Sequence, residues 1–339
     1  MKRITLFTVL AMGLIGSSTA CRQEIPYPAK TSERTITISL LSPETLTKAG
    51  ETTQTEAEKA ISSFDVFLFS DGILSRHERI SGTNGKIKAM SGFDYKACVV
   101  ANTDKDFSSV QSEQDLLETV FDFTDNGPGN FIMVSDMQTI PSFEKDETLE
   151  FEMKRLVAKI ALSGDITIDL PEDHAYYGNA KVASAFILNI PESATFSMEQ
   201  GSSKMLNDGS VSVSPSGIVQ NGIPMTYLNI DGGSGAKADF YCYPNSEKES
   251  EDIREKDKVT KFVICALFGD KQYYYPIGIP DIKSNHVYEI SSVSITTEGS
   301  EEQNQYVIGP TLNFTVSVKD WSTGYFLGNY SSGDKVFKF

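Results

Sequence analysis

Basic residues and reactive side chains are scarce in this sequence. Its 339 residues hold 30 lysines and arginines against 46 acidic residues, a formal net charge of −16. A nucleic-acid-binding protein needs a basic face, and no basic stripe is present. Only 3 histidines occur, and none lies at a metal-ligand spacing. Nucleophile elbows, phosphate-binding loops and dinucleotide-binding glycine motifs are also missing. We therefore expect neither a nucleic-acid partner nor an enzyme, and no metal or other cofactor.

Cysteine is scarce too, with 4 in the chain. Beyond Cys21 there are three, Cys98, Cys242 and Cys265, an odd number that excludes a disulfide-rich scaffold. Cys242 and Cys265 lie in two strand-like segments, where one bridge between them is possible. We favour buried free thiols, because cysteine is among the most buried residue types.

The chain also lacks a long hydrophobic run. Two basic residues, an apolar stretch over residues 4–15 and several small residues precede Cys21. This pattern predicts a signal peptide over residues 1–20, whose apolar part is too short for a membrane-spanning helix of about 20 residues. Cleavage next to an incidental cysteine is one interpretation. We favour lipoprotein processing, in which acyl chains such as palmitate on Cys21 anchor the chain to a bacterial membrane, although Ser18 stands where a leucine is usual.

What the sequence does have is a long series of strand-like segments. In the stretch TITISLL (35–41), Ile36, Ile38 and Leu40 point to one side and hydroxyl side chains to the other, which predicts a half-buried strand. Similar segments follow to the end of the chain, separated by turn residues such as Asp71-Gly72. Helical spacing occurs only over residues 56–61 and 108–122. This succession of strand-like segments and turns predicts an all-β fold of the sandwich type.

Length suggests two domains. Residues 21–34 are a polar tether with two prolines. We expect an N-terminal domain over residues 35–154, which includes the first strand, and a C-terminal domain over residues 155–339. The polar segment after the first strand reads as an exposed loop with one basic residue, Lys48, where a protease can cut.

Five features, in this order along nearly the whole mature chain, resemble the fimbrillins of Bacteroidales, the FimA/Mfa-type or type V pilins. They are the lipoprotein signal with Cys21; an early strand followed by a polar loop and then Glu58, Ile61 and DVFLF (65–69); RLVAKIAL (155–162); SNHVYEISSVSI (284–295); and VSVKDW (316–321). In the fourth feature, Ser284 replaces the basic residue usual in the family. The resemblance implies two transthyretin-like β-sandwich domains in tandem, with short helical segments in the first.

The resemblance also implies a function, that of a structural subunit of a cell-surface fimbria that supports adhesion. Such precursors are exported as outer-membrane lipoproteins and then cut in the loop after the first strand, which here implies processing between Lys48 and Ala49. The family's protease is typically specific for arginine, and this loop has none. Loss of the strand removes Ile36, Ile38 and Leu40 from a hydrophobic groove, which a strand from another subunit then fills.

The C-terminal tail, residues 322–339, is the candidate donor of that strand. Its alternating apolar residues are Tyr325, Leu327, Val336, Phe337 and Phe339. The alternative is that the tail closes its own sandwich as an edge strand. Partners would be further copies of the chain, related fimbrial subunits and a host or bacterial receptor.

Two other functions stay open at this point. A fimbrial tip or anchor subunit would donate or accept a strand but not both. A surface glycan-binding lipoprotein would need an exposed aromatic platform, for which Tyr273, Tyr274 and Tyr275 are candidates. In an alternating strand Tyr274 faces away from its two neighbours, so at least one side of this cluster is expected to pack in the core.

Overall fold

The computed structural model describes residues 31–42, 54–209, 211–230, 237–248, 258–306, 311–323 and 325–331. Strands make up about half of these residues and helices very few, and the all-β prediction is confirmed. The helical elements are short: α1 (Glu56–Lys59), α2 (Glu113–Leu117) and a 3-10 turn, η1 (Phe123–Asp125). Within the described ranges, no helix has the length and apolar character needed to cross a membrane.

The first strands form one eight-stranded sheet. Its order is β3 (Ile73–Ser81), β2 (Ser63–Ser70), β5 (Tyr95–Ala101), β7 (Met133–Ser135), β9 (Glu147–Arg155), β1 (Glu33–Leu41) and β4 (Asn84–Met90), with β8 (Gln138–Ile140) beside β5. Every pair in this sheet is antiparallel except β1 with β9. The first strand of the chain is therefore an interior strand of its sheet.

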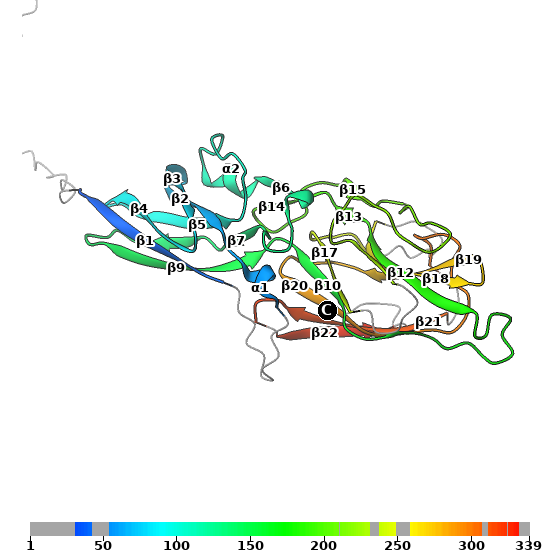
Figure 1. Ribbon diagram of the computed structural model, residues 1–339. Coiled ribbons are helices and arrows are strands. Elements are labelled where there is room, and N and C mark those ends of the chain that lie inside the picture. The colour runs from blue at the N-terminus through cyan, green and yellow to red at the C-terminus, as the bar shows by residue number, and fades with distance from the viewer. Residues whose placement is uncertain are drawn as a thin grey trace, which may run out of the picture.

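The later strands form two further large sheets. One contains β17 (Ala238–Cys242), β10 (Ala158–Leu162), β20 (His286–Ile295), β21 (Leu312–Asp320) and β22 (Phe326–Ser331), with β11 (Ile166–Ile168) beside β20. The other contains β16 (Tyr227–Asn229), β12 (Ala180–Leu188), β18 (Thr260–Phe268) and β19 (Lys271–Ile279). Figure 1 places the eight-stranded sheet at one end of an elongated molecule and these two sheets at the other.

The chain passes from the first sheet to the later ones between β9 and β10, where Arg155 and Ala158 are the last and first strand residues. Two small strand pairs lie nearby. They are β13 (Ile190–Pro191) with β15 (Met205–Leu206), and β14 (Ser193–Thr195) with β6 (Val120–Asp122). The second pair hydrogen-bonds a segment that follows α2 to one that follows β12. The division into domains at residues 154 and 155 stays a prediction.

Local sequence accounts for the first hairpin. Asp71 and Gly72 both have positive φ, 50° and 77°, which two-residue hairpin turns of this type require. The hairpin of β2 and β3 at this turn was expected from the sequence and is confirmed.

The helical prediction over residues 108–122 is mostly wrong. Only α2 forms there, started by a capping box in which the Ser112 hydroxyl and the Asp115 carboxylate each bond the other's backbone N–H. Thr119 ends it by donating its hydroxyl to the Asp115 carbonyl, and Val120 begins β6. The apolar spacing reflects a turn packed on the sheet and not a long helix.

The core explains two other sequence features. Tyr273 and Tyr275 pack in the main hydrophobic cluster and Tyr274 in a smaller one, so the tyrosines face opposite sides of β19. All three are buried, and no exposed aromatic platform forms at that point. Cys98, Cys242 and Cys265 are buried and free, as we favoured, and burial raises the pKa of the Cys265 thiol to about 12.

Candidate functional site

The candidate site begins with β1, which is held on both sides. It pairs antiparallel with β4 from Glu33 to Ser39 and parallel with β9 from Ile36 to Leu41. Figure 1 shows it between these two strands at the edge of the molecule. Because β1 is interior to the sheet, its removal would leave two unpaired strand edges facing each other.

The inner face of β1 fills a hydrophobic groove. Ile36 and Ile38 are 0% exposed and Leu40 is 6% exposed. Each such side chain contributes about 1.5–3 kcal/mol by its burial. The groove would therefore expose a large apolar surface if β1 left, and its refilling by another alternating strand would be strongly favourable.

The residues proposed for processing lie outside the described part of the chain. These are Cys21, Lys48 and Ala49, in the segments 1–30 and 43–53. β1 ends at Leu41, and the described chain resumes at Gln54. Along the chain, residues 42–53 link β1 to the strands that follow it.

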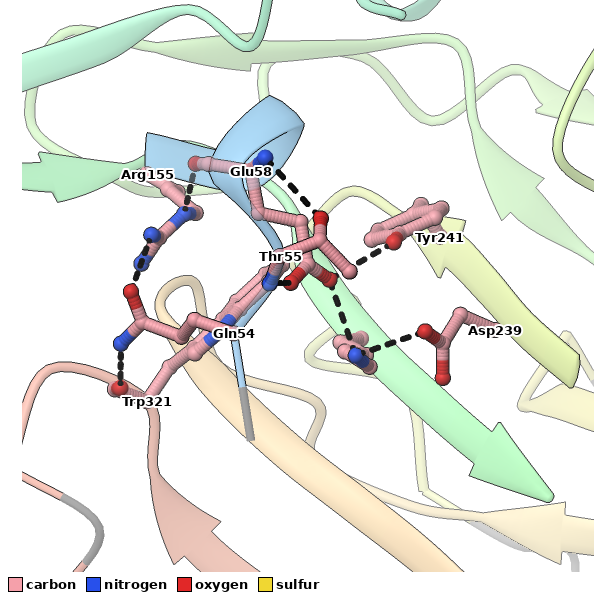
Figure 2. Close-up of polar contacts among 8 residues, drawn as sticks. Gln54, Thr55, Glu58, Arg155, Asp239, Tyr241 and Trp321 are labelled. Carbon is pink, nitrogen blue, oxygen red and sulfur yellow. Dashed lines mark hydrogen bonds and ion pairs between the residues drawn. The ribbon is translucent and has the colours of Figure 1, made fainter. Parts of the chain in front are cut away.

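Directly after that link, the chain is fixed by a buried polar cluster, which we call the junction clamp. Its members are Gln54, Glu58, Arg155, Lys159, Tyr241 and Trp321, all buried and at most 8% exposed. They come from α1 and the residues just before it, β9, β10, β17 and the turn after β21. Figure 2 shows all of them except Lys159 with labels, pointing toward one another. The clamp thus lies where the eight-stranded sheet meets the six-stranded one.

One half of the junction clamp is built on Arg155. Its Nε donates to the Glu58 carbonyl at 2.8 Å and its Nη2 to the Gln54 side-chain oxygen at 2.9 Å. Gln54 in turn donates to the Trp321 carbonyl at 2.7 Å. The guanidinium lies 4.3 Å from the centre of the Trp321 ring, a cation–π contact. The first residues after the link are therefore fastened to both β9 and the end of β21 (Figure 2).

The other half is built on the Glu58 carboxylate. One oxygen accepts from Lys159 Nζ at 2.9 Å and from the Tyr241 hydroxyl at 2.8 Å, and the other accepts from the Thr55 backbone N–H at 2.6 Å. The last bond belongs to the capping box that starts α1. Lys159 also pairs with Asp239 at 2.7 Å. Lys159 thus pairs with two carboxylates, which limits the cost of burying the charges.

The same contacts set the protonation of the junction clamp. Burial alone would raise the pKa of Glu58, but the charge of Lys159 and the hydrogen bonds from Lys159, Thr55 and Tyr241 outweigh it and hold this pKa below its usual value. Burial lowers the pKa of Arg155 to about 10, partly offset by Glu58, so the guanidinium stays charged at neutral pH.

We expect the Glu58 carboxylate to contribute to acid sensitivity. A carboxylate whose pKa is lowered by folding stabilises the folded state above the unfolded pKa and loses that contribution as the pH falls through the folded pKa. Unfolding by urea, followed from about pH 7 to 3, should therefore show a shallower acid-side loss of stability in Glu58→Gln than in the parent. Glu56→Gln, on the exposed side of the same helix, should follow the parent curve; equal slopes for all three proteins would contradict this role.

The junction clamp unites residues that the sequence presented as separate motifs. Glu58, Arg155, Lys159 and Trp321 each belong to one of the quoted fimbrillin-like segments. The fourth segment joins them, since Asn285 accepts from the Arg155 backbone N–H through its side chain and from the Trp321 N–H through its carbonyl. Sequence reasoning missed Gln54, Asp239 and Tyr241, which lie in no motif that it singled out.

The C-terminal candidates divide into two groups. Tyr325, Phe326 and Leu327 are 71%, 53% and 45% exposed, at or next to the start of β22, which pairs with β21. Residues 326–331 thus close their own sheet as an edge strand, the alternative left open by the sequence. Val336, Phe337 and Phe339 lie outside the described residues.

An open cleft of about 760 Å³ separates the end of β1 from the turn between β21 and β22. It is lined by Leu40, Leu41, Ser42, Glu152, Met153, Lys154, Asn285, Asp320, Ser322 and Thr323. No group of three or more histidine, cysteine or acidic side chains suited to a metal ion occurs in the described ranges. What the described residues of this site do is pair strands and bury apolar side chains.

Comparison with known proteins bears on the family and the fold of this chain. Residues 35–189 match the family model of the major fimbrial subunit protein (FimA). No curated protein sequence matches the chain. Several solved structures share the fold. They include a proposed cell adhesion protein from Bacteroides eggerthii, with TM-score 0.62, 18% identity and coverage of 87% of this chain and 98% of that one.

Two solved fimbrial proteins of Porphyromonas gingivalis are also similar. The fimbrilin FimA has TM-score 0.57 and 16% identity, with coverage of 86% of this chain and 98% of that chain. The C-terminally truncated tip fimbrial protein Mfa3 has TM-score 0.50 and 12% identity, with coverage of 86% and 100%. The fimbrillin resemblance found in the sequence is therefore confirmed by the match of residues 35–189 to the FimA family model and by the shared fold of these solved structures.

Proposed function

We propose that this chain is a stalk subunit of a cell-surface fimbria, which polymerises when β1 is cut off and replaced by a strand of another copy. The observation that carries the proposal is the position of β1. It is the first described strand, it is interior to its sheet, and its three apolar side chains are buried. A terminal strand that is also interior can leave in one piece and be replaced in one piece.

The junction clamp supports this role because it separates the strand that leaves from the chain that stays. Gln54 and α1 are held by Arg155, Lys159 and Trp321. A cut within residues 43–53 would therefore release β1 and everything before it, while the clamp keeps the rest of the chain folded. The same contacts join the eight-stranded sheet to the six-stranded sheet.

The remaining parts of the proposal concern export and partners. Cys21 would carry the lipid that holds the precursor at the outer membrane before processing, and cutting after Lys48 would free the subunit for assembly at the cell surface. Its partners would be further copies and related fimbrial subunits, and the fimbria would support adhesion. A tip or anchor subunit is the alternative, favoured by the lack of arginine in the segment 43–53.

Limited proteolysis tests the proposal. Non-lipidated mature protein is treated with a low dose of trypsin, the new N-terminus is read, and the product is run unboiled on a gel. We expect a new N-terminus at Ala49 and a ladder of heat-sensitive multimers. Lys48→Gln should abolish both, whereas Lys59→Gln, whose lysine pairs with Glu56 on α1, should leave both unchanged.

The other outcomes separate the alternatives. A cut at Ala49 without a ladder would contradict the stalk role and favour a tip or anchor subunit. Resistance of residues 41–63 to cutting would mean that β1 is a permanent part of the fold, and strand exchange would be wrong for this chain.

A further inference from the structure

The outer rim of the β1 groove carries charge of opposite sign on its two sides. On β4, Lys86 and Lys88 point outward and are exposed; on β9, Glu150 and Glu152 do the same. Lys88 Nζ donates to the Thr35 hydroxyl at 2.9 Å. In the part of the chain that the structure describes, no ion pair involves any of these four side chains.

The pairing register places these charges at different levels along β1. Lys88 lies beside Thr35 and Lys86 beside Thr37, whereas Glu150 lies beside Ser39. Glu152 lies beside Leu41, at the end of the strand. An outward side chain in the groove therefore meets positive neighbours at the N-terminal end of β1 and negative neighbours at its C-terminal end.

Two further charged groups belong to the rim, and one of them, Asp146, adds a carboxylate beside Thr35 at the end where Lys86 and Lys88 lie. Asp146 accepts from the Thr35 backbone N–H at 2.9 Å, a bond that any strand in this place could donate. Lys154, beyond Glu152, is paired with Asp136 at 2.6 Å. β1 itself offers only hydroxyl groups, Thr35, Thr37 and Ser39, between the charged rows.

The C-terminal tail has a matching charge order. It ends DKVFKF, in which Phe337 and Phe339 alternate with Lys338, and Asp334 shares the parity of Lys338. An acidic residue thus precedes a basic one on the face opposite the two aromatic rings. Along the tail the acidic residue comes first and the basic residue second. Along the groove the basic Lys88 comes first and the acidic Glu150 second, so the two charge orders are complementary.

Building on the proposed function, we propose that the rim charges orient the strand that replaces β1. The tail of a second copy enters in the same direction as β1, with Phe337 in the place of Ile38 and Phe339 in that of Leu40. Asp334 then lies beside Lys88 and Lys338 beside Glu150. The specificity-determining residues of the groove are therefore the rim residues Lys86, Lys88, Glu150 and Glu152.

The opposite direction is disfavoured at both ends. With Phe337 again in the place of Ile38, reversal puts Lys338 beside Lys86 and Asp334 beside Glu152, so each charge meets its like. The remaining tail charge agrees, because Lys335 takes the place of Ile36 beside Glu147 in the proposed direction. Its apolar stem can line the groove while its ammonium reaches that carboxylate. If the tail entered in the opposite direction, Lys335 would lie beside Phe151.

A crosslink reports the direction in which the tail enters the groove without altering any of these charges. A biotinylated peptide of residues 328–339 carrying Ser332→Cys is offered to the trypsin-cut chain. In the proposed direction position 332 lies beside Met90, the register partner of Glu33; in reverse it lies past Ser42, at the cleft lined by Thr323. The three native thiols are buried, so a disulfide reports only the introduced pair.

We expect the peptide to crosslink to Met90→Cys and not to Thr323→Cys. Preferential crosslinking to Thr323→Cys, or equal crosslinking to both, would overturn the proposed direction while leaving strand exchange intact. No capture of the parent peptide by the cut chain would overturn both proposals together. The two failures are therefore distinguishable.

Charge reversal then tests whether the rim charges cause the preferred direction of insertion. Exposed cross-strand charge pairs are individually weak, so Glu150→Lys should slow multimer growth by about 3- to 10-fold at low salt. Lys338→Glu in the donor should restore most of that rate, and the effect should fade at high salt. Glu172→Lys, an exposed reversal with the same change in net charge, should not slow growth. Equal rates for Glu150→Lys and Glu172→Lys would contradict a role for the rim.

Discussion

A disulfide that ties β1 to β4 is expected to abolish assembly. Thr37 and Lys86 lie directly opposite each other in the antiparallel register and both point outward. Opposed residues of such strands have Cα atoms about 4.5–5.5 Å apart, within the range that a disulfide spans. In the oxidised Thr37→Cys/Lys86→Cys chain β1 stays in its groove even after the loop is cut. The gel ladder should be absent, and reductant should restore it.

A matched pair elsewhere controls for the presence of a disulfide. Ser294 and Asn313 are register partners on β20 and β21, away from the β1 groove. The oxidised Ser294→Cys/Asn313→Cys chain should assemble like the parent. Assembly of the oxidised Thr37→Cys/Lys86→Cys chain would mean that β1 need not leave, and the exchange mechanism would be wrong.

Truncating Glu58 is expected to give the largest loss of stability. Glu58→Ala removes the acceptor of Lys159 and Tyr241 and leaves their polar groups buried with too few partners. Breaking a buried ion pair by removing one partner typically costs about 3–5 kcal/mol. The free energy of unfolding, measured in urea on the uncut chain, should fall by that amount.

Two variants show whether this cost belongs to the buried charges. Glu56→Ala, whose pair with Lys59 lies at the surface, should change stability by less than about 1 kcal/mol. Glu58→Met combined with Lys159→Met replaces the pair by apolar side chains and should cost much less than the sum of the two single changes. Strict additivity would show that the two side chains act independently and would contradict a coupled clamp.

The strands were largely predictable because their signals are local. The alternation of Ile36, Ile38 and Leu40 marks a buried face within one strand, and Asp71-Gly72 marks a hairpin within four residues. Predictions failed where the structure depends on partners distant in sequence. The apolar spacing around Leu116 resembles a helix, yet pairing of β6 with β14 takes its last residues into a strand.

The junction clamp could not be predicted for the same reason. Its residues run from Gln54 to Trp321, and single charged residues are far more often exposed than buried. The motifs identified Glu58, Arg155 and Lys159 individually, but nothing local indicates that they meet. The register of β10 with β17 places Lys159 beside Tyr241, and α1 brings Glu58 to both of them. Likewise, the charge order of the groove rim follows from the pairing of β1 with β4 and β9, which no single segment reveals.

Replacement of β1 by a strand of another copy can be read from the intact mass of the chains in heat-dissociated multimers. If β1 is replaced by a strand of another copy, every accepting chain should begin at Ala49, and the fragment that ends at Lys48 should be missing from the multimers. If the multimers contain that fragment in equal amount to the subunit, β1 has remained in its groove, and replacement of β1 is contradicted.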